Sequence, residues 1–170
     1  CELCAHVCRL KVGEFGRCGV RLCHAFEDEE GPRIGLLTLV GEKVAAFNLD
    51  PVEKKPLYHF LPGTQTLSFG TMGCNLGCTF CQNHALSQPP KLERNIQGRT
   101  MRPEEIVAQA LEMGAQSISY TYSEPTIFFE LMLATARLAT EQGLKNIMVS
   151  NGFMSPQCLQ ELAPWIHAAN

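Results

Sequence analysis

The amino-acid sequence predicts an α/β fold organised around a parallel sheet. Three observations support this prediction: strand-like and helix-like segments alternate from residue 66 onward, prolines stand where helices would begin, and glycines stand where they would end. Parallel strands need a long crossover connection, which is usually a helix. Strand–helix alternation at this spacing therefore implies right-handed βαβ units.

The regular part of the pattern contains three expected strands and three expected helices. The strands are at 66–72, 117–122 and 146–150, and the helices are at 103–113, at 125–142 and from Pro156 onward. Pro103 suits the first position of a helix, and Gly114 suits the position just after its end. Ser155 is a typical N-cap residue for the third helix.

The segments before residue 66 are less regular. Residues 1–23 form a cysteine-rich block, and residues 24–35 contain the acidic run EDEEG, which is typical of a solvated turn. The stretch IGLLTLVG is strand-like. The following VAAFNLDPVEKKPLYHFLPG contains three prolines and is expected to be an ordered loop. In that loop we expect Lys54 and Lys55 to face solvent and His59 to be a satisfied core histidine.

Three loops are expected to meet at one edge of the sheet. They are GTMGCNLGCTFCQN, SEP and SNG, and each follows one of the expected strands. Functional sites of parallel α/β sheets gather at the carboxyl ends of the strands. The cysteines and polar residues therefore fall where a site is expected.

Composition narrows the possible partners and the compartment. The chain has 14 basic and 17 acidic residues and a formal net charge of −3, which argues against an electrostatic grip on nucleic acid or an anionic membrane. We find no transmembrane-length apolar run and no signal peptide, so we expect a cytoplasmic location. The chain has nine cysteines: five lie in the first 23 residues, three lie in one short stretch, and Cys158 stands alone. Close spacings in such a chain indicate metal ligands rather than disulfides.

The stretch CNLGCTFC holds three of these cysteines, Cys74, Cys78 and Cys81. Thiolates select zinc, copper(I) or iron–sulfur clusters, and a closed zinc site takes four ligands. Three thiolates on one short loop suit three corners of a [4Fe–4S] cluster and leave one iron open to a small chelating molecule. Phe80, beside the last cysteine, can shield one side of the cluster. The alternative is a zinc site or another structural site.

The Cys74-x3-Cys78-x2-Cys81 motif follows a first strand and has an aromatic residue before its last cysteine, so it resembles the radical S-adenosylmethionine (radical SAM) superfamily. The resemblance implies a partial (βα) barrel with a [4Fe–4S] cluster and S-adenosyl-L-methionine as cofactors. It implies reductive cleavage of the latter to methionine and a 5′-deoxyadenosyl radical, which abstracts hydrogen from a substrate. An electron donor such as flavodoxin or ferredoxin is the implied partner.

Two further loops match the same superfamily. YSEP at 122–125 occupies the place of the family's glycine-glycine-glutamate-proline segment, which holds the amino group of the cofactor, and this implies binding roles for Ser123 and Glu124. SNG at 150–152 resembles a third-strand motif of the pyruvate formate-lyase activating enzyme branch, in which Asn151 would hydrogen-bond the cofactor. The alternatives are an ordinary helix start at Glu124 and an Asn-Gly turn.

A narrower resemblance covers nearly the whole chain. The segments CELCAHVC, GRCGVR, DPVEKKPLYHFLPG, GTMGCNLGCTFCQN and YTYSEPT together resemble the radical SAM member of the AmmeMemoRadiSam system. That member is described as similar to pyruvate formate-lyase activating enzyme, which implies an activity like that of a glycyl-radical activase. One departure is Ala5, where that family has proline. Gln82 and Asn83 follow the last cysteine of the motif and are further candidates to line the site.

The amino-terminal cysteines form a second candidate site. Four of them could supply thiolates to zinc or to a second cluster: Cys1, Cys4, Cys8 and Cys18. A metal there would order a short block that has few apolar side chains. His6 and Cys23 are spare candidates, and the alternative is a set of buried free thiols. Cys158 is expected to be a core thiol.

Two regions are expected, a cysteine-rich extension with a connecting loop at 1–65 and the N-terminal half of a partial barrel at 66–170. A βα unit takes about 30 residues, judged from about 250 for eight units. The second region thus holds three of the six units that the resemblance implies, and it stops where a fourth strand is expected. We therefore expect a fragment or a truncated product, with an unidentified substrate. The competing hypothesis is a non-catalytic, metal-stapled scaffold or a zinc-binding interaction protein.

Overall fold

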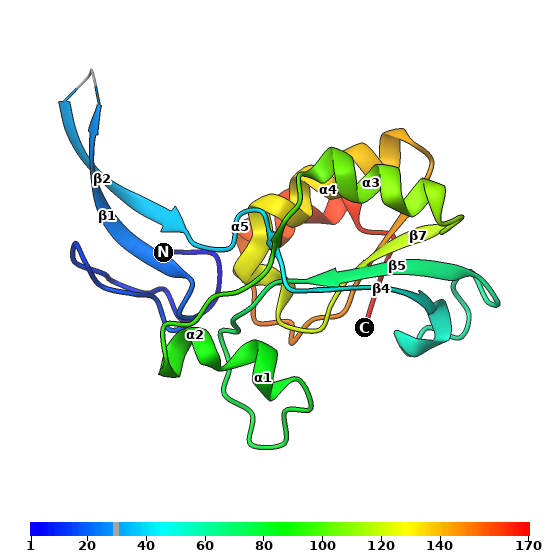
Figure 1. Ribbon diagram of the computed structural model, residues 1–170, viewed down its shortest axis with the longest axis horizontal. Coiled ribbons are helices and arrows are strands. Elements are labelled where there is room, and N and C mark those ends of the chain that lie inside the picture. Colours follow the sequence, from blue (N-terminus) through cyan, green and yellow to red (C-terminus); the bar gives the residue numbers. More distant parts are fainter. Residues whose placement is uncertain (29–30) are drawn as a thin grey trace.

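A five-stranded sheet forms the centre of the computed structural model, which describes residues 1–28 and 31–170 (Figure 1). In spatial order its strands are β4 (Ala46–Pro51), β5 (Gln65–Gly70), β7 (Ser117–Tyr120), β8 (Lys145–Met148) and β9 (Ala168–Ala169). The last four strands run parallel, and β4 pairs with β5 in the antiparallel direction. The expected α/β fold is therefore confirmed, and its parallel strands are those of a partial (βα) barrel.

Three helices cover one face of this sheet (Figure 1). They are α3 (Pro103–Glu112), α4 (Phe129–Glu141) and α5 (Pro156–Leu162). Short 3₁₀ segments occur at η1 (Val52–Lys54), η2 (Pro125–Phe128) and η3 (Ala163–Trp165). Pro103 and Pro156 begin their helices as expected, and the Ser155 hydroxyl caps α5 by accepting a hydrogen bond from the Cys158 N–H at 3.2 Å. Among the described residues, no helix is long and apolar enough to cross a membrane.

The two faces of the sheet differ in polarity. Strands β5 and β7 direct apolar residues toward the helices, where they join the hydrophobic core: Leu67, Phe69, Ile118 and Tyr120. The residues between them are hydroxyl-bearing and fully buried: Thr66, Ser68, Ser117 and Ser119. Successive side chains of a strand point to opposite faces, so this alternation places a polar layer on the side away from the helices.

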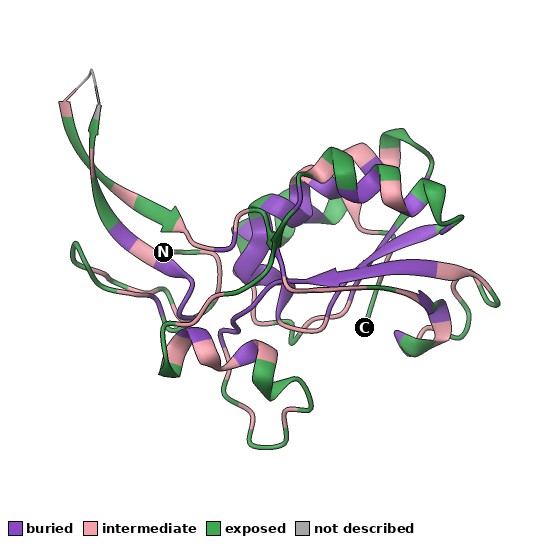
Figure 2. Cartoon of the chain, in the orientation of Figure 1, coloured by how far each residue is buried: buried purple, intermediate pink, exposed green. Residues whose placement is uncertain are grey.

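The smaller elements surround this body. They are the strands β1 (Arg21–Asp28), β2 (Gly31–Thr38), β3 (Lys43–Val44) and β6 (Arg99–Thr100), and the helices α1 (His84–Ser87) and α2 (Pro89–Leu92). Strands β1 and β2 form an antiparallel hairpin that projects from the molecule, while β3 pairs with β6 (Figure 1). Figure 2 shows that much of this hairpin is exposed, whereas the central strands are mostly buried.

The strands and helices expected in residues 66–170 are all present, with ends that shift by a few residues. The helix expected at 125–142 begins with a 3₁₀ segment and becomes α-helical at Phe129. A fourth parallel strand begins where it is expected, because β9 pairs with β8.

The expectation of an ordered loop over residues 46–51 is wrong, because these residues form edge strand β4. Phe47 and Leu49 pack against the hydrophobic core, whereas Asn48 and Asp50 belong to the polar face. This alternation is a strand signal, and the neighbouring prolines obscure it. The sheet therefore includes a strand from the region before residue 66.

The expectation of a turn over residues 24–35 is also wrong in its extent. Most of this stretch belongs to the paired strands β1 and β2. The centre of the acidic run, at positions 29 and 30, lies outside the described residues.

Candidate functional site

The loop after β5 carries the three-cysteine motif and bends tightly against the amino-terminal block. Gly73 has a φ of +103°, a left-handed conformation that favours glycine. A Cβ atom at this position would lie 2.6 Å from the Val20 side chain and 3.2 Å from the Cys18 carbonyl oxygen. The Gly73 N–H donates to the Leu86 carbonyl oxygen at 3.0 Å. The loop therefore depends on a glycine here for its course.

The three thiols of this loop differ in exposure. Cys74 is 8% exposed, and Cys78 and Cys81 are half-buried. The Cys74 Sγ accepts a hydrogen bond from the Leu76 N–H at 3.4 Å, and the Cys81 Sγ lies 3.4 Å from the Ser87 Oγ. Burial raises the pKa of the Cys74 thiol. A bound metal acts in the opposite direction, because it stabilises the thiolate.

Glu124 lies at the end of the loop after β7 and is only 1% exposed. One carboxylate oxygen accepts hydrogen bonds from the N–H and hydroxyl of Thr126 at 3.1 and 2.6 Å, and from the Ser150 hydroxyl at 2.8 Å. The other oxygen accepts from the Asn151 N–H at 2.7 Å. Burying a carboxylate is costly unless it is hydrogen-bonded, and these four bonds meet that requirement.

Side-chain amides connect the cysteine loop to the other two strand-end loops. The Asn151 Nδ2, in the loop after β8, lies 3.8 Å from the Cys74 Sγ. The Asn83 Nδ2, two residues after the last cysteine of the motif, donates to the Tyr122 carbonyl oxygen at 2.8 Å. The three loops expected at one edge of the sheet are therefore in direct contact.

These loops enclose a cavity of about 90 Å³. Its lining includes the three cysteines of the motif and residues from the two other loops: Tyr122, Ser123, Glu124 and Asn151. The same four residues line a second cavity of about 210 Å³, so the two cavities are neighbours. The Ser123 Oγ is buried and has no hydrogen-bond partner within the described part of the chain. This hydroxyl therefore has unused hydrogen-bonding capacity next to the cavity.

Comparison with known proteins decides the family. The model of the radical SAM superfamily matches residues 69–166, which is more than half of the chain. The chain belongs to the radical SAM superfamily. It is also similar to "Uncharacterized protein MJ0808" of Methanocaldococcus jannaschii, with 42% identity over 163 residues, which are 95% of this chain and 46% of that protein. The chain thus spans about half the length of that relative.

The donor set fits the cofactors that the radical SAM superfamily typically uses, a [4Fe–4S] cluster and S-adenosylmethionine. Three thiols line one cavity, and three thiolate ligands would leave one iron of a cubane open to S-adenosylmethionine. In residues 1–28 and 31–170, no three His, Cys, Asp or Glu side chains are arranged to hold a single metal ion. The unpaired Ser123 hydroxyl offers a polar contact in the same cavity.

Most cofactor-site residues expected from the sequence lie together. The smaller cavity is lined by all three cysteines of the motif and by Ser123, Glu124 and Asn151, and Asn83 lines the larger one. Phe80 lines neither cavity and is 84% exposed, so its shielding role stays a prediction. Tyr122 lines both cavities and was not expected there. The sequence signal that could have indicated Tyr122 is its large side chain at a position where the matching segment of the radical SAM family has glycine.

The structure contradicts the expectations for Lys55 and His59 and confirms the one for Cys158. Lys55, expected to face solvent, is 4% exposed and donates to the Asp50 carboxylate at 2.8 Å, so that expectation is wrong. His59 is exposed, so the expectation of a core histidine is also wrong. Cys158 is confirmed as a core thiol, and burial raises its pKa to about 12.

The amino-terminal cysteines expected to form a second site also lie together. A cavity of about 20 Å³ is lined by Cys1, Cys4, Cys8, Cys18 and the spare candidate His6. Cys23 is buried but does not line it. The block contacts the radical SAM region: the Ala5 N–H donates to the Phe153 carbonyl oxygen at 3.1 Å, and the His6 Nε2 lies 2.8 Å from the Asn75 carbonyl oxygen. The amino-terminal thiols therefore gather next to the cysteine loop.

Proposed function

We propose that this chain carries the cofactor-binding part of a radical SAM enzyme. When bound, the [4Fe–4S] cluster and S-adenosylmethionine would supply an electron and a 5′-deoxyadenosyl radical for hydrogen abstraction. The observation that carries the proposal is the single cavity lined by the three thiols of the cysteine loop together with Ser123, Glu124 and Asn151. The residues of the chain would bind and orient these two cofactors.

The cysteine loop would hold the cluster through three thiolates. Cys74 would anchor it in the interior, because this thiol is buried and faces two nitrogen donors, the Leu76 N–H and the Asn151 Nδ2. Hydrogen bonds to cluster sulfurs are one of the factors that set the reduction potential. Cys78 and Cys81 would complete the set nearer to the surface.

The amino-acid part of S-adenosylmethionine would bind along the loop after β7. The Glu124 carboxylate is complementary to an ammonium group, and its four hydrogen bonds fix its orientation. Ser123 lines the same cavity, and its buried hydroxyl, which has no partner among the described residues, would bond the ligand after a side-chain rotation. Asn151 would contribute from the third loop, where its backbone already contacts Glu124.

We further propose that a small redox protein such as flavodoxin or ferredoxin supplies the electron. Two cluster cysteines are only half-buried, and the intervening Phe80 is 84% exposed, so the proposed cluster lies close to the surface that such a donor could reach. The overall resemblance to the AmmeMemoRadiSam member supports an activity like that of a glycyl-radical activase. On this proposal the substrate is a protein or a small molecule.

Anaerobic reconstitution tests the proposal directly. The unmodified chain should bind about four irons at this site, and the triple change of Cys74, Cys78 and Cys81 to Ala should remove about four irons per chain. Cys23→Ala is a matched control, because Cys23 is buried but lines no cavity described above. S-adenosylmethionine should change the paramagnetic resonance spectrum of the reduced cluster. Iron content that survives the triple change would show that the assignment is wrong.

A second proposal concerns the amino-terminal block. We propose that Cys1, Cys4, Cys8 and Cys18 bind one zinc ion, because their cavity of about 20 Å³ is near the size of a single water-sized sphere. Their thiols would have to move closer together to do so, since among the described residues no three His, Cys, Asp or Glu side chains are placed to hold one ion. This cavity is also the observation that favours the competing function, a zinc-stapled scaffold. A colourless preparation that holds zinc and no iron after anaerobic reconstitution would support that alternative.

A further inference from the structure

Tyr122 has a backbone conformation that is rare for a residue with a side chain. Its φ is +68°, and the Ser123 N–H donates to the Thr121 carbonyl oxygen at 2.9 Å. A three-residue turn closed in this way, with positive φ at its centre, is rare and strained. The next two residues, Ser123 and Glu124, line the cavity assigned to the cofactor. The strained turn is therefore adjacent to the residues that would bind S-adenosylmethionine.

Close packing leaves this turn little room to relax. A Cβ atom on Gly70, at the end of β5, would collide with the Thr121 carbonyl oxygen and would lie 3.3 Å from the Tyr122 Cβ. Next to the cysteine loop, the Asn83 amide holds the Tyr122 carbonyl oxygen. The backbone of the turn is thus in contact with both the strand and the loop that precede it in the chain.

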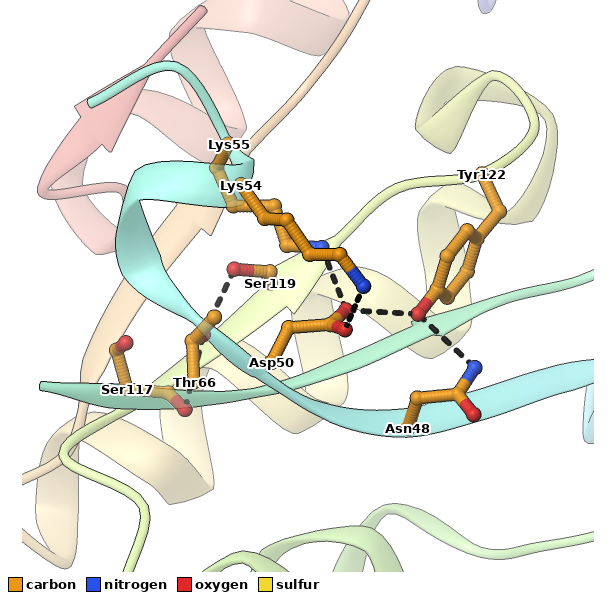
Figure 3. A network of polar contacts seen from close by, with 8 residues as sticks. All are labelled: Asn48, Asp50, Lys54, Lys55, Thr66, Ser117, Ser119 and Tyr122. Atoms are coloured by element: carbon orange, nitrogen blue, oxygen red, sulfur yellow. Dashed lines mark hydrogen bonds and ion pairs between the residues drawn. The ribbon is translucent and has the colours of Figure 1, made fainter. Parts of the chain in front are cut away.

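The Tyr122 side chain is anchored to β4 and lies near Lys55, the residue that follows η1 (Figure 3). Its hydroxyl donates to the Asp50 Oδ2 at 2.9 Å and accepts from the Asn48 Nδ2 at 3.0 Å. The Lys55 Nζ donates to the same Asp50 oxygen at 2.8 Å and lies 5.2 Å from the centre of the Tyr122 ring. The Lys54 Nζ contacts the other carboxylate oxygen at 2.9 Å. Lys54 and Lys55 therefore hold the Asp50 carboxylate in place, and that carboxylate holds the Tyr122 hydroxyl.

The protonation states agree with these roles. Burial raises the pKa of the Tyr122 phenol, so the hydroxyl keeps its proton and can donate it. Burial works to raise the pKa of Asp50, but hydrogen bonds from Lys55, Lys54 and Tyr122 outweigh it and hold that pKa well below its usual range. Asp50 is thus an ionised acceptor at neutral pH. Hydrogen bonds to a charged acceptor are stronger than those between neutral groups.

We propose that Tyr122 is a positioning residue: its phenol, anchored by Asp50, holds the strained turn and so sets Ser123 and Glu124 for binding S-adenosylmethionine. This inference rests on the proposed function. Glycine adopts positive φ without a steric cost, and the resemblance to the radical SAM family places glycine at this position. In this chain a side-chain anchor would maintain the same conformation.

The proposal predicts that Tyr122→Gly binds S-adenosylmethionine more tightly than Tyr122→Ala. Loss of side-chain volume alone predicts the opposite order. Tyr122→Ala removes the anchor and keeps the Cβ atom that makes positive φ costly, whereas Tyr122→Gly removes both. The Kd for S-adenosylmethionine, measured on the reconstituted chain, should be about 5- to 30-fold higher for the Ala variant than for the Gly variant. If Tyr122 only fills space, the Gly variant leaves the larger hole and should bind more weakly. That order would overturn the proposal.

Tyr122→Phe isolates the hydroxyl group. It should raise the Kd at least about threefold, the effect of a lost hydrogen bond. It should also speed amide hydrogen exchange at Ser123 in the chain without cofactors, because the turn loses its anchor. Tyr58→Phe is the matched control, since Tyr58 is 67% exposed and lines neither cavity. Unchanged Ser123 exchange together with an unchanged Kd in Tyr122→Phe would overturn the proposal.

The measurements keep this inference separate from the proposed function. If the unmodified chain takes up iron and fails to bind S-adenosylmethionine, the proposed function fails, and the positioning role for that cofactor fails with it. If the unmodified chain binds, equal iron content in all Tyr122 variants shows that they fold and hold the cluster. Because Tyr122 itself lines the cavity, the comparison between the Ala and Gly variants, which both lack the ring, reports on the turn, and its order decides the inference.

Discussion

The Glu124 carboxylate accepts a 2.7 Å hydrogen bond from the Asn151 N–H, and this contact joins the loops after β7 and β8. Glu124 also accepts from the Ser150 hydroxyl of the same loop at 2.8 Å. Because the carboxylate is 1% exposed, its four bonds have no competition from solvent. One side chain therefore organises two of the three loops around the proposed cofactor cavity.

Replacing Glu124 by Gln should weaken both the fold and the binding of S-adenosylmethionine. An amide nitrogen in place of a carboxylate oxygen leaves at least one buried donor without its acceptor, which costs about 1–3 kcal/mol of unfolding free energy. Denaturant unfolding and a titration with S-adenosylmethionine measure the two effects. Glu141→Gln, at an exposed position at the end of α4, should change stability by less than about 0.5 kcal/mol. Equal stability of the two variants would contradict the role given to the Glu124 network.

Removing Glu130 should loosen the attachment of the amino-terminal region to α4. The Arg21 guanidinium donates to both Glu130 carboxylate oxygens at 2.6 and 2.5 Å and to the Ile127 carbonyl oxygen at 3.0 Å. Arg21 is 4% exposed, so Glu130→Ala leaves buried donors unsatisfied and should cost about 1–3 kcal/mol in denaturant unfolding.

A second ion pair provides the control for that change. Arg137 and Glu161 are 3.9 Å apart, and both side chains are about half exposed. Glu161→Ala should therefore cost less than about 1 kcal/mol. A cost as large as that of Glu130→Ala would show that burial of Arg21 is not the cause.

Stability should fall in acid through Asp50. Its pKa in the folded chain lies well below the usual value, so its ionised form stabilises the fold above the unfolded pKa of about 3.9. That contribution is lost as the pH falls below about 4 toward the folded pKa. Unfolding free energies of the unmodified chain and of Asp50→Asn should thus differ most near neutral pH and converge as the pH falls below about 4. A difference that stays constant from pH 7 to pH 3 would contradict this account.

Changing Cys4 and Cys8 to Ser should disorder the amino-terminal block without removing the proposed cluster. Both residues line the small cavity, and metal binding there is expected to order a block with few apolar side chains. Limited proteolysis should cut the double variant faster before residue 24, while iron at the Cys74 loop persists. Cys23→Ser serves as the control. A protected block together with lost iron would reverse the roles of the two cysteine groups.

The sequence by itself determined the cysteine motif, the strand–helix alternation and the loops in which the site lies. These features depend on local periodicity and on residues such as Pro103 and Ser155, whose effects act within a few positions. The placement of Ser123, Glu124 and Asn151 beside the cysteines followed because parallel strands end at one edge of a sheet.

Only the tertiary structure decided the strand at 46–51, the burial of Lys55 and the strained turn at Tyr122. The contact between Asp50 and Tyr122 spans 72 positions, and that between His6 and Asn75 spans 69. Contacts of this kind form only when the sheet brings distant segments together, and no pattern within a few residues records them. Lys55, which the local sequence assigns to solvent, is buried beside the Asp50 carboxylate on the polar face of the sheet, because a buried charge is stable only next to a partner of opposite charge.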